Sequence, residues 1–293
     1  MIDLPPAAAP PRRSRLGAVL WSLGFLVGGA ALAIGVAIGG MTLAGMAGLD
    51  RHSIPVQAAV QSGAMLAAFG FLTWAIGHRQ LGLTLAGLRY RPAGGPAASI
   101  GLGFLAGCAP AAATLLLGVA LAGARWAPDT GTAVDYLGSV GQTLAILVPA
   151  AFAEELIFRG VPMVVLARAY GRGAAIVSLA VAFGLVHLLN PNVTGLGVVN
   201  VALAGIFLGA VFFTRGGIWA AFGAHLGWNT TLAALDAPVS GLPFRIPLID
   251  YLSGGPAWLT GGSFGPEGGL LATMTMSLAT LAVVRWSRRA EGA

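Results

Sequence analysis

Residues 16–49 form one uninterrupted apolar run, LGAVLWSLGFLVGGAALAIGVAIGGMTLAGMAGL, which contains no charged side chain. A helix needs about 20 such residues to cross the hydrocarbon core of a bilayer, so this run can form a tilted membrane-spanning helix. The apolar region of a secretory signal peptide has only about 7–15 residues. We therefore interpret the run as a first membrane span, preceded by a disordered, Pro/Ala-rich tail at residues 1–15.

Apolar runs of the same kind recur along the chain, which is 57% hydrophobic and 9% charged. Soluble domains carry about 25% charged residues, so a soluble globular protein is excluded. In hydrocarbon every backbone polar group must be bonded within the protein, and continuous apolar runs favour helices over a barrel. The sequence predicts an all-α polytopic membrane protein, with a single domain over residues 16–293 and about eight transmembrane helices. The predicted spans are 17–48, 55–77, 97–123, 138–168, 173–189, 195–214, 216–236 and 267–286.

The basic residues predict the orientation. All 16 are arginines, and most lie singly or in pairs at the ends of apolar runs. Cytoplasmic loops are enriched in such residues, so both termini are expected in the cytoplasm of a multi-pass protein of the inner cell membrane. Their dispersal argues against a nucleic-acid partner and indicates the lipid bilayer instead. The arginines then predicted on the cytoplasmic side are Arg12, Arg13, Arg15, Arg79, Arg89, Arg91, Arg168, Arg172, Arg215, Arg285, Arg288 and Arg289.

Two further stretches are predicted to be loops. Residues 78–96 are expected on the cytoplasmic side, and the Gly/Pro-rich residues 237–266 form the longest external loop. Glu267 is expected among the external acids. Glycines spaced four apart allow helices to approach closely, which predicts packing within the monomer and leaves the oligomeric state open. These pairs are Gly24/Gly28, Gly35/Gly39 and Gly205/Gly209.

A few polar residues fall inside the predicted spans. A charge at mid-bilayer costs about 2.5–3.5 kcal/mol on insertion scales, so residues of this kind are candidates for function. They are Glu154, Glu155 and Arg159 in span four, His187 in span five, and His225 and Asn229 in span seven.

Their spacing indicates different roles. Glu155 and Arg159 are four residues apart in the favourable order for an ion pair on one helix face, which predicts a supporting role. Glu154 points about 100° away and has no partner on its own helix, so its carboxyl group is suited to proton transfer. His225 and Asn229 also share one face, and their side chains can approach one point.

The polar groups are expected at similar depths. At about 1.5 Å per residue, Glu154, His187 and His225 lie roughly 21, 22 and 15 Å from the cytoplasmic edge. Phe183, one turn before His187, is expected to form part of the wall between them. A carboxylate, two imidazoles and the amide of Asn229 in one water-filled pocket suit hydrolysis. A proton or ion path uses similar residues, so the spacing alone leaves both open.

Three short motifs carry a resemblance to a known family. EELIFRG at 154–160 fits EExxxR, FGLVH at 183–187 fits FxxxH, and HLGWN at 225–229 fits HxxxN. In this order and on separate predicted helices, they resemble the CPBP family of type II CAAX prenyl endopeptidases and bacteriocin-processing (Abi) proteins. The resemblance covers a core at about residues 137–236.

The resemblance implies an intramembrane endopeptidase, often labelled a metalloprotease, that cleaves a membrane-associated peptide or protein. It implies Glu154 as general base with His187, and His225 with Asn229 as groups that stabilise the oxyanion. Glu155 and Arg159 would hold span four in place. Glu154, His187 and His225 are alternatively a ligand set for a divalent metal such as zinc, although a glutamate-activated water needs no metal.

Two other classes of protein fit the same sequence. A non-catalytic immunity or scaffold protein can retain the site for its structure. A proton-coupled transporter also uses buried acids and histidines, but transporters often show repeated halves, and no internal repeat is evident here.

Overall fold

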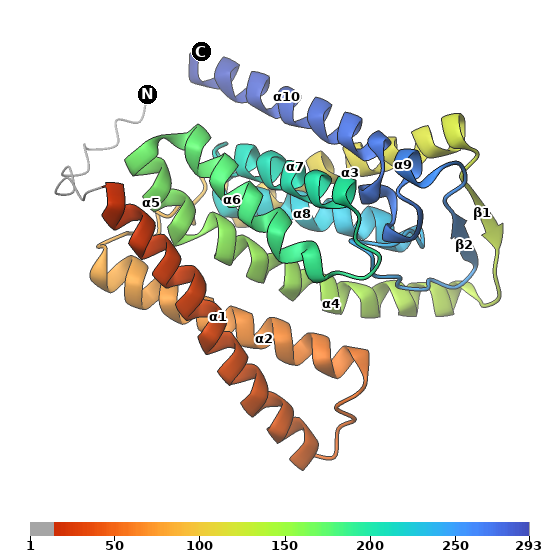
Figure 1. The fold of residues 1–293 in the computed structure, drawn as a ribbon, viewed down its shortest axis with the longest axis horizontal. Helices are drawn as coiled ribbons and strands as arrows, with labels where there is room; N and C mark the ends of the chain where they lie inside the picture. Colours follow the sequence, from red (N-terminus) through yellow and green to blue (C-terminus); the bar gives the residue numbers. More distant parts are fainter. Residues whose placement is uncertain (1–14, 293) are drawn as a thin grey trace.

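The computed structural model describes residues 15–292, and the tail predicted at 1–15 lies outside this range except for Arg15. Helices dominate the chain (Figure 1). They are α1 (Arg15–Met46), α2 (Ile54–Leu72), a π-helix (Thr73–Gln80), α3 (Pro96–Ala122), α4 (Ala133–Arg159), α5 (Val161–Tyr170), α6 (Arg172–Val186), a 3-10 turn (His187–Leu189), α7 (Gly195–Phe212), α8 (Gly217–Ala234), α9 (Ala257–Thr260), 3-10 turns at Gly262–Phe264 and Pro266–Gly268, and α10 (Leu270–Gly292).

The long helices form one bundle. Helices α3, α4, α6, α7, α8 and α10 run along the long axis of the molecule (Figure 1). Helices α1 and α2 form a hairpin that packs on α4 and α5 near one end of the bundle and diverges from it towards the connecting loop. The polar motifs on α4, α6 and α8 therefore lie within the bundle rather than on this hairpin.

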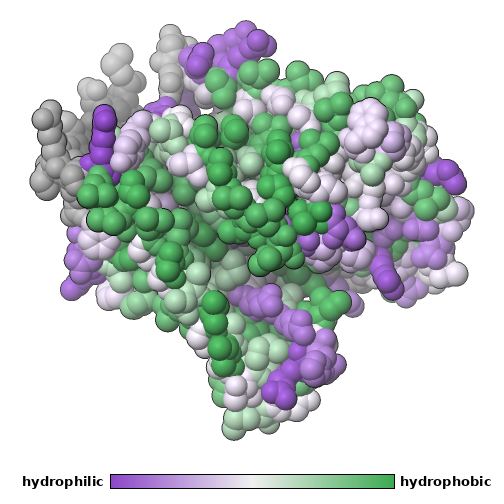
Figure 2. Space-filling model, in the orientation of Figure 1, coloured by the Kyte–Doolittle hydropathy of each residue, from purple (hydrophilic) through white to green (hydrophobic). Residues whose placement is uncertain are grey.

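Six helical segments in the described residues are long and apolar enough to cross a membrane. They are Arg15–Met46, Ile54–Gln80, Pro96–Ala122, Arg172–Leu189, Gly195–Phe212 and Leu270–Arg289. This confirms an all-α polytopic membrane protein. Large apolar side chains such as Leu102 and Leu278 are exposed on these helices, and apolar groups cover much of the face in Figure 2, as contact with lipid requires. Helices α4 and α8, which carry the EELIFRG and HLGWN motifs, are not among the six, whereas α6 with FGLVH is.

The span predicted at 138–168 is wrong as a single helix. Helix α4 ends at Arg159 and α5 begins at Val161, because Gly160 leaves the helical conformation with a ψ of −130°. Pro162 in the first turn of α5 has no backbone N–H and is tolerated there. A side chain at position 160 would also meet the Leu156 carbonyl, at 2.2 Å from the ideal Cβ position.

The two predicted loops are more ordered than expected. Residues 125–128 (β1) pair antiparallel with 249–252 (β2) in a small sheet at one end of the bundle, so the 237–266 segment contains a strand. At the opposite end, the loop after the π-helix buries Leu83 and Leu88. There the Arg89 guanidinium donates to the backbone carbonyls of Phe212 and Phe213 at the C-terminal end of α7.

The predicted glycine pairs have different outcomes. Gly205 and Gly209 of α7 lie against Ala180 and Ile176 of α6, as close helix packing requires. The prediction is wrong for α1, because an ideal Cβ at any of its four paired glycines would meet no atom within 4 Å. Those glycines are Gly24, Gly28, Gly35 and Gly39.

The closest helix contact in the bundle joins α3 and α8 through glycines that the sequence analysis did not single out. An ideal Cβ at Gly107 would lie 1.9 Å from the Ala224 carbonyl oxygen, and one at Gly103 would lie 2.1 Å from that of Ala220. Gly223 and Gly227 of α8 pack equally tightly against the α3 backbone. Small residues at such a crossing allow backbones to touch, which fixes the position of α8 and of the HLGWN motif it carries.

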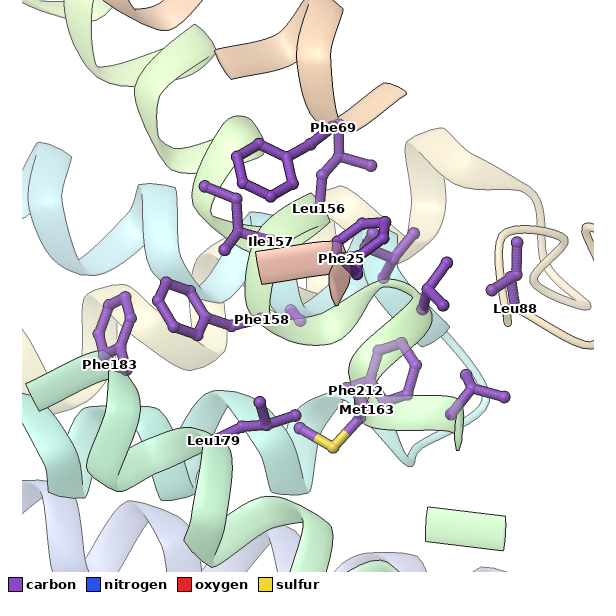
Figure 3. Packing of buried hydrophobic residues seen from close by; sticks show 14 of the residues in the cluster. Phe25, Phe69, Leu88, Leu156, Ile157, Phe158, Met163, Leu179, Phe183 and Phe212 are labelled. Carbon is purple, nitrogen blue, oxygen red and sulfur yellow. The ribbon is translucent and has the colours of Figure 1, made fainter. Parts of the chain in front are cut away.

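A second set of contacts fixes α4 against its neighbours. Phe25 of α1 and Phe69 of α2 pack with Leu156 of α4 in one buried cluster, and Phe158 of α4 meets Phe183 of α6 edge to face (Figure 3). The apolar residues that follow the two acids of α4 therefore pack it against α1, α2 and α6.

We predict that Gly107→Leu strongly destabilises the protein, because no side chain fits between the α3 and α8 backbones. Overpacking costs about 1–3 kcal/mol even where side chains can adjust, and here the obstacle is backbone. Thermal unfolding in detergent should show a clearly lower Tm. Gly28→Leu on α1 is the matched control, since its Cβ meets open space, and equal Tm values for the two variants would contradict the assigned packing.

Candidate active site

Glu155 and Arg159 form a buried ion pair on α4. Arg159 donates from Nη1 to Glu155 Oε1 at 3.0 Å, and the side chains are 1% and 0% exposed. Arg159 also donates from Nη2 to the Gly205 carbonyl of α7 at 3.2 Å and lies 4.8 Å from the centre of the Phe183 ring. The predicted pairing is therefore present, and the pair joins α4 to α6 and α7.

His225 of α8 lies between the two acids of the motif. Its Nδ1 is 2.8 Å from Glu155 Oε1, and its Nε2 is 3.7 Å from Glu154 Oε2. Because Glu155 accepts from Arg159 as an ionised carboxylate, we assign the Nδ1 proton of His225 to the hydrogen bond with Glu155. The Nε2 atom then faces Glu154, and the sequence analysis had not foreseen this link between α4 and α8.

Glu154 differs from its neighbour in its surroundings. Its side chain is 27% exposed, and Oε2 is buried without a hydrogen-bond partner. A buried oxygen of this kind normally has a protein or water partner. Glu155 Oε2 also lacks a partner among the described residues, but Glu155 is 0% exposed and does not line the cavity described below. Glu154 is therefore the carboxylate that water can reach.

His187 lies at the point where α6 gives way to a 3-10 turn. Its Nδ1 is 2.7 Å from the Phe183 carbonyl oxygen. A carbonyl can only accept, so Nδ1 carries the proton and Nε2 keeps its lone pair. Phe183 thus orients His187 with its backbone, while its ring packs 4.7 Å from the imidazole.

A cavity of about 230 Å³ brings the predicted residues together. Its lining includes Glu154 from α4, His187 at the end of α6, and His225 and Asn229 from α8, with Phe183 in the wall as expected. A buried water needs only about 10–15 Å³ of such space. The cavity can therefore hold water beside part of a peptide chain, with an acid, two imidazoles and an amide around it.

The sequence analysis missed one acid of this cavity. Glu267, predicted to be external, lines the cavity and is only 7% exposed. Trp228 donates to one of its oxygens at 3.0 Å, and Ser240 donates to the other. Glu267 lies directly before the α10 span. Burial raises the pKa of its carboxyl group, while these hydrogen bonds and the nearby His187 act to lower the pKa. The only sequence signal for it is an acid directly before an apolar run.

The geometry does not fit a preformed three-ligand metal site. Among the described residues, no group of three or more His, Cys, Asp or Glu side chains is placed to hold a metal ion. Glu154 and His225 approach each other, but with His187 they do not form such a group.

The fold and the cavity define a polytopic membrane protein with a buried acid–histidine cluster of the kind that hydrolases use. Residues 136–231 match the family model described as type II CAAX prenyl endopeptidase Rce1-like. The matched segment contains all three motifs and resembles this family, and the match supports a peptidase at the level of the family. No curated protein and no solved structure matches the chain.

We predict that Glu155→Gln destabilises the fold, because it leaves the Arg159 charge buried without its ionised partner. Breaking a buried pair from one side costs about 3–5 kcal/mol. The measurement is the Tm in detergent, with the neighbouring Glu154→Gln as control. That variant should unfold close to the wild-type temperature, and equal losses in both would contradict the separate roles of the two acids.

Proposed function

We propose that this protein is an intramembrane endopeptidase in which Glu154 activates a water molecule to cleave a membrane-associated peptide or protein. The observation that carries the proposal is that Glu154, His187, His225 and Asn229 line one cavity. The match of residues 136–231 to a peptidase family adds support for the class of reaction.

The reaction begins with water between Glu154 and His187. Glu154 takes one proton from the water as the oxygen attacks the carbonyl carbon of the peptide bond. The lone pair of His187 Nε2 accepts a hydrogen bond from the same water and orients it, since Phe183 holds the ring through Nδ1. A tetrahedral intermediate forms, with negative charge on the former carbonyl oxygen.

His225 and Asn229 are proposed to stabilise that oxyanion. The Asn229 amide N–H donates to it, and so does the Nε2–H of His225 in its doubly protonated form. Glu155, which stays ionised beside Nδ1 after Glu154 has taken the proton, offsets the charge of this form. Glu154 then gives its proton to the leaving nitrogen and the C–N bond breaks, which gives a carboxylic acid and an amine. The acid passes its remaining proton to the amine, so the products leave as a carboxylate and an ammonium group.

Because Glu154 is the proposed general base, activity should depend on its carboxylate. Membrane peptides that accumulate in cells carrying Glu154→Ala identify a substrate, which is then synthesised and cleaved by purified protein in liposomes. We predict that Glu154→Gln lowers kcat/KM at least about a hundredfold, the usual contribution of a general base.

The control is Asp250→Asn on the exposed part of β2, which should cleave at the wild-type rate. Chelation of divalent metals should also leave the rate unchanged, because Glu154 activates the water directly. Full activity of Glu154→Gln would overturn the mechanism. A cellular phenotype that survives Glu154→Ala would favour a non-catalytic immunity or scaffold protein, and substrate-dependent flux in proteoliposomes would favour a transporter.

We further propose that α4 with α5, and α8, also cross the membrane. This gives eight spans across the inner cell membrane, with both termini on its cytoplasmic side. Helix α4 has 27 residues, and its charges are satisfied inside the bundle by the Glu155–Arg159 pair. Ionisable groups at membrane depth are tolerated when they face the interior of a bundle and pair with each other.

The orientation predicts labelling from opposite sides. With Cys108 replaced by alanine, Thr130→Cys near β1 should react with a membrane-impermeant maleimide in intact cells. Gly94→Cys, in the loop before α3, should react only after permeabilisation. Both positions are exposed in the structure. The reverse pattern would contradict the cytoplasmic placement of the termini.

A further inference from the structure

Glu267 is a buried carboxylate in the cavity that the proposed reaction does not use. It lies in the 3-10 turn Pro266–Gly268, directly before α10, and outside the three motifs. Its side chain faces the same cavity as Glu154 and His187. A buried carboxylate needs partners to offset its lost hydration, so the groups around it indicate what it holds in place.

Three donors from two separate elements converge on this carboxylate. Trp228 of α8 donates its indole N–H to Oε1 at 3.0 Å. Ser240 donates its hydroxyl to Oε2 at 3.0 Å and its backbone N–H to the same oxygen. Hydrogen bonds to an ionised acceptor are about twice as strong as neutral ones. Glu267 therefore ties the loop that follows α8 to α8 itself.

The turn that carries Glu267 is itself anchored to the bundle. Asn200 of α7 donates to the backbone carbonyls of Glu267 and Gly269 at 2.8 and 2.9 Å. The Thr273 hydroxyl donates to the side-chain oxygen of Asn200. The Ser240 loop has two further ties: Asn190 donates to the Ser240 carbonyl at 2.9 Å, and the Gly241 N–H donates to the Phe264 carbonyl at 2.8 Å. The turn that carries Glu267 is thus anchored to α7, and Glu267 in turn positions the Ser240 loop.

Helix α8 does not depend on Glu267 for its position. The glycine contacts with α3 and the hydrogen bond between His225 and Glu155 fix it from other sides. Loss of the Glu267 carboxylate should therefore loosen the Ser240 loop, which keeps its ties to Asn190 and Phe264, while His225 and Asn229 stay in place.

The Ser240 loop forms part of an apolar cavity wall. Val239, Ser240 and Leu242 from this loop all line the cavity. The other apolar lining residues on helices and loops include Phe207, Leu208, Phe244 and Met276. Such a wall favours a large apolar side chain and disfavours a charged one, which would lose its hydration there.

We propose that Glu267 is a positioning residue that holds residues 239–242 as one wall of the substrate cavity, and so selects a large apolar side chain beside the scissile bond. The inference rests on the proposed endopeptidase function. It assigns Glu267 to substrate selection and leaves the chemistry to Glu154.

The test uses the peptide that accumulates in the Glu154→Ala cells, with each residue flanking the scissile bond replaced in turn by Leu, Ala or Asp. Wild-type protein should prefer Leu over Ala on one side by about tenfold or more in kcat/KM, as apolar pockets do. In Glu267→Gln this preference should fall to about twofold, through a higher KM for the Leu peptide with kcat nearly unchanged. The amide keeps the size of the side chain but turns an N–H₂ towards one of the donors.

Two further variants separate this role from a general loss of structure. Trp228→Phe keeps the ring packing and removes one donor, so it should lower the preference by a smaller factor. Asp250→Asn removes an exposed acid and should leave the preference unchanged. Unchanged selectivity in Glu267→Gln would overturn the proposal, and so would an equal fall in kcat for all peptides.

A measurement without substrate tests the same contact. The amide of Ser240 should exchange its hydrogen faster in Glu267→Gln than in wild type, because it loses its charged acceptor. Unchanged exchange would overturn the proposed anchor, even if no peptide is cleaved. If the wild type cleaves no peptide, or if Glu154→Gln cleaves as fast as the wild type, the proposed endopeptidase function is overturned instead. The two failures are therefore distinguishable.

Discussion

The buried ion pair between Glu155 and Arg159 is the interaction on which the site depends. A charge inside a membrane bundle is costly unless it is paired and hydrogen-bonded, and here the pair has further partners. Glu155 reaches His225 on α8, while Arg159 reaches Gly205 on α7 and stacks on Phe183 of α6. One charge pair on α4 therefore sets the relative positions of the helices that surround the cavity.

This arrangement separates two acids that are adjacent in the chain. Successive residues on a helix point about 100° apart, so Glu155 can face its partners while Glu154 faces the cavity. Because Glu155 satisfies both Arg159 and the Nδ1 of His225, Glu154 needs no structural role, and its Oε2 is free for water. Proton transfer by Glu154 is thus possible because Glu155 holds Arg159 and His225 through its Oε1 and leaves Glu154 facing the cavity.

The remaining walls of the cavity are built by two different means. Glycine contacts between α3 and α8 bring backbones together and give the rigid side that carries His225 and Asn229. Polar side chains hold the opposite side, where Glu267 ties the Ser240 loop to Trp228 and Asn200 ties the Glu267 turn to α7. Backbone contact leaves little freedom, whereas a loop held by a few hydrogen bonds can differ in shape and so suits selection between substrates.

The sequence by itself determined the membrane class, the pairing of Glu155 with Arg159 and the three motifs, because apolar length, helical spacing and residue type are local properties. The break at Gly160 also has local signals, because a glycine is followed by Pro162. The sequence alone does not decide whether such signals end a helix within a long apolar run. Tertiary structure alone decided that Glu155 meets His225, that the α1 glycines face outward while Gly107 and Gly223 form the tight crossing, and that Glu267 turns into the cavity. Each of these depends on which distant segments lie against each other, and a contact between distant segments leaves no periodic trace in either one.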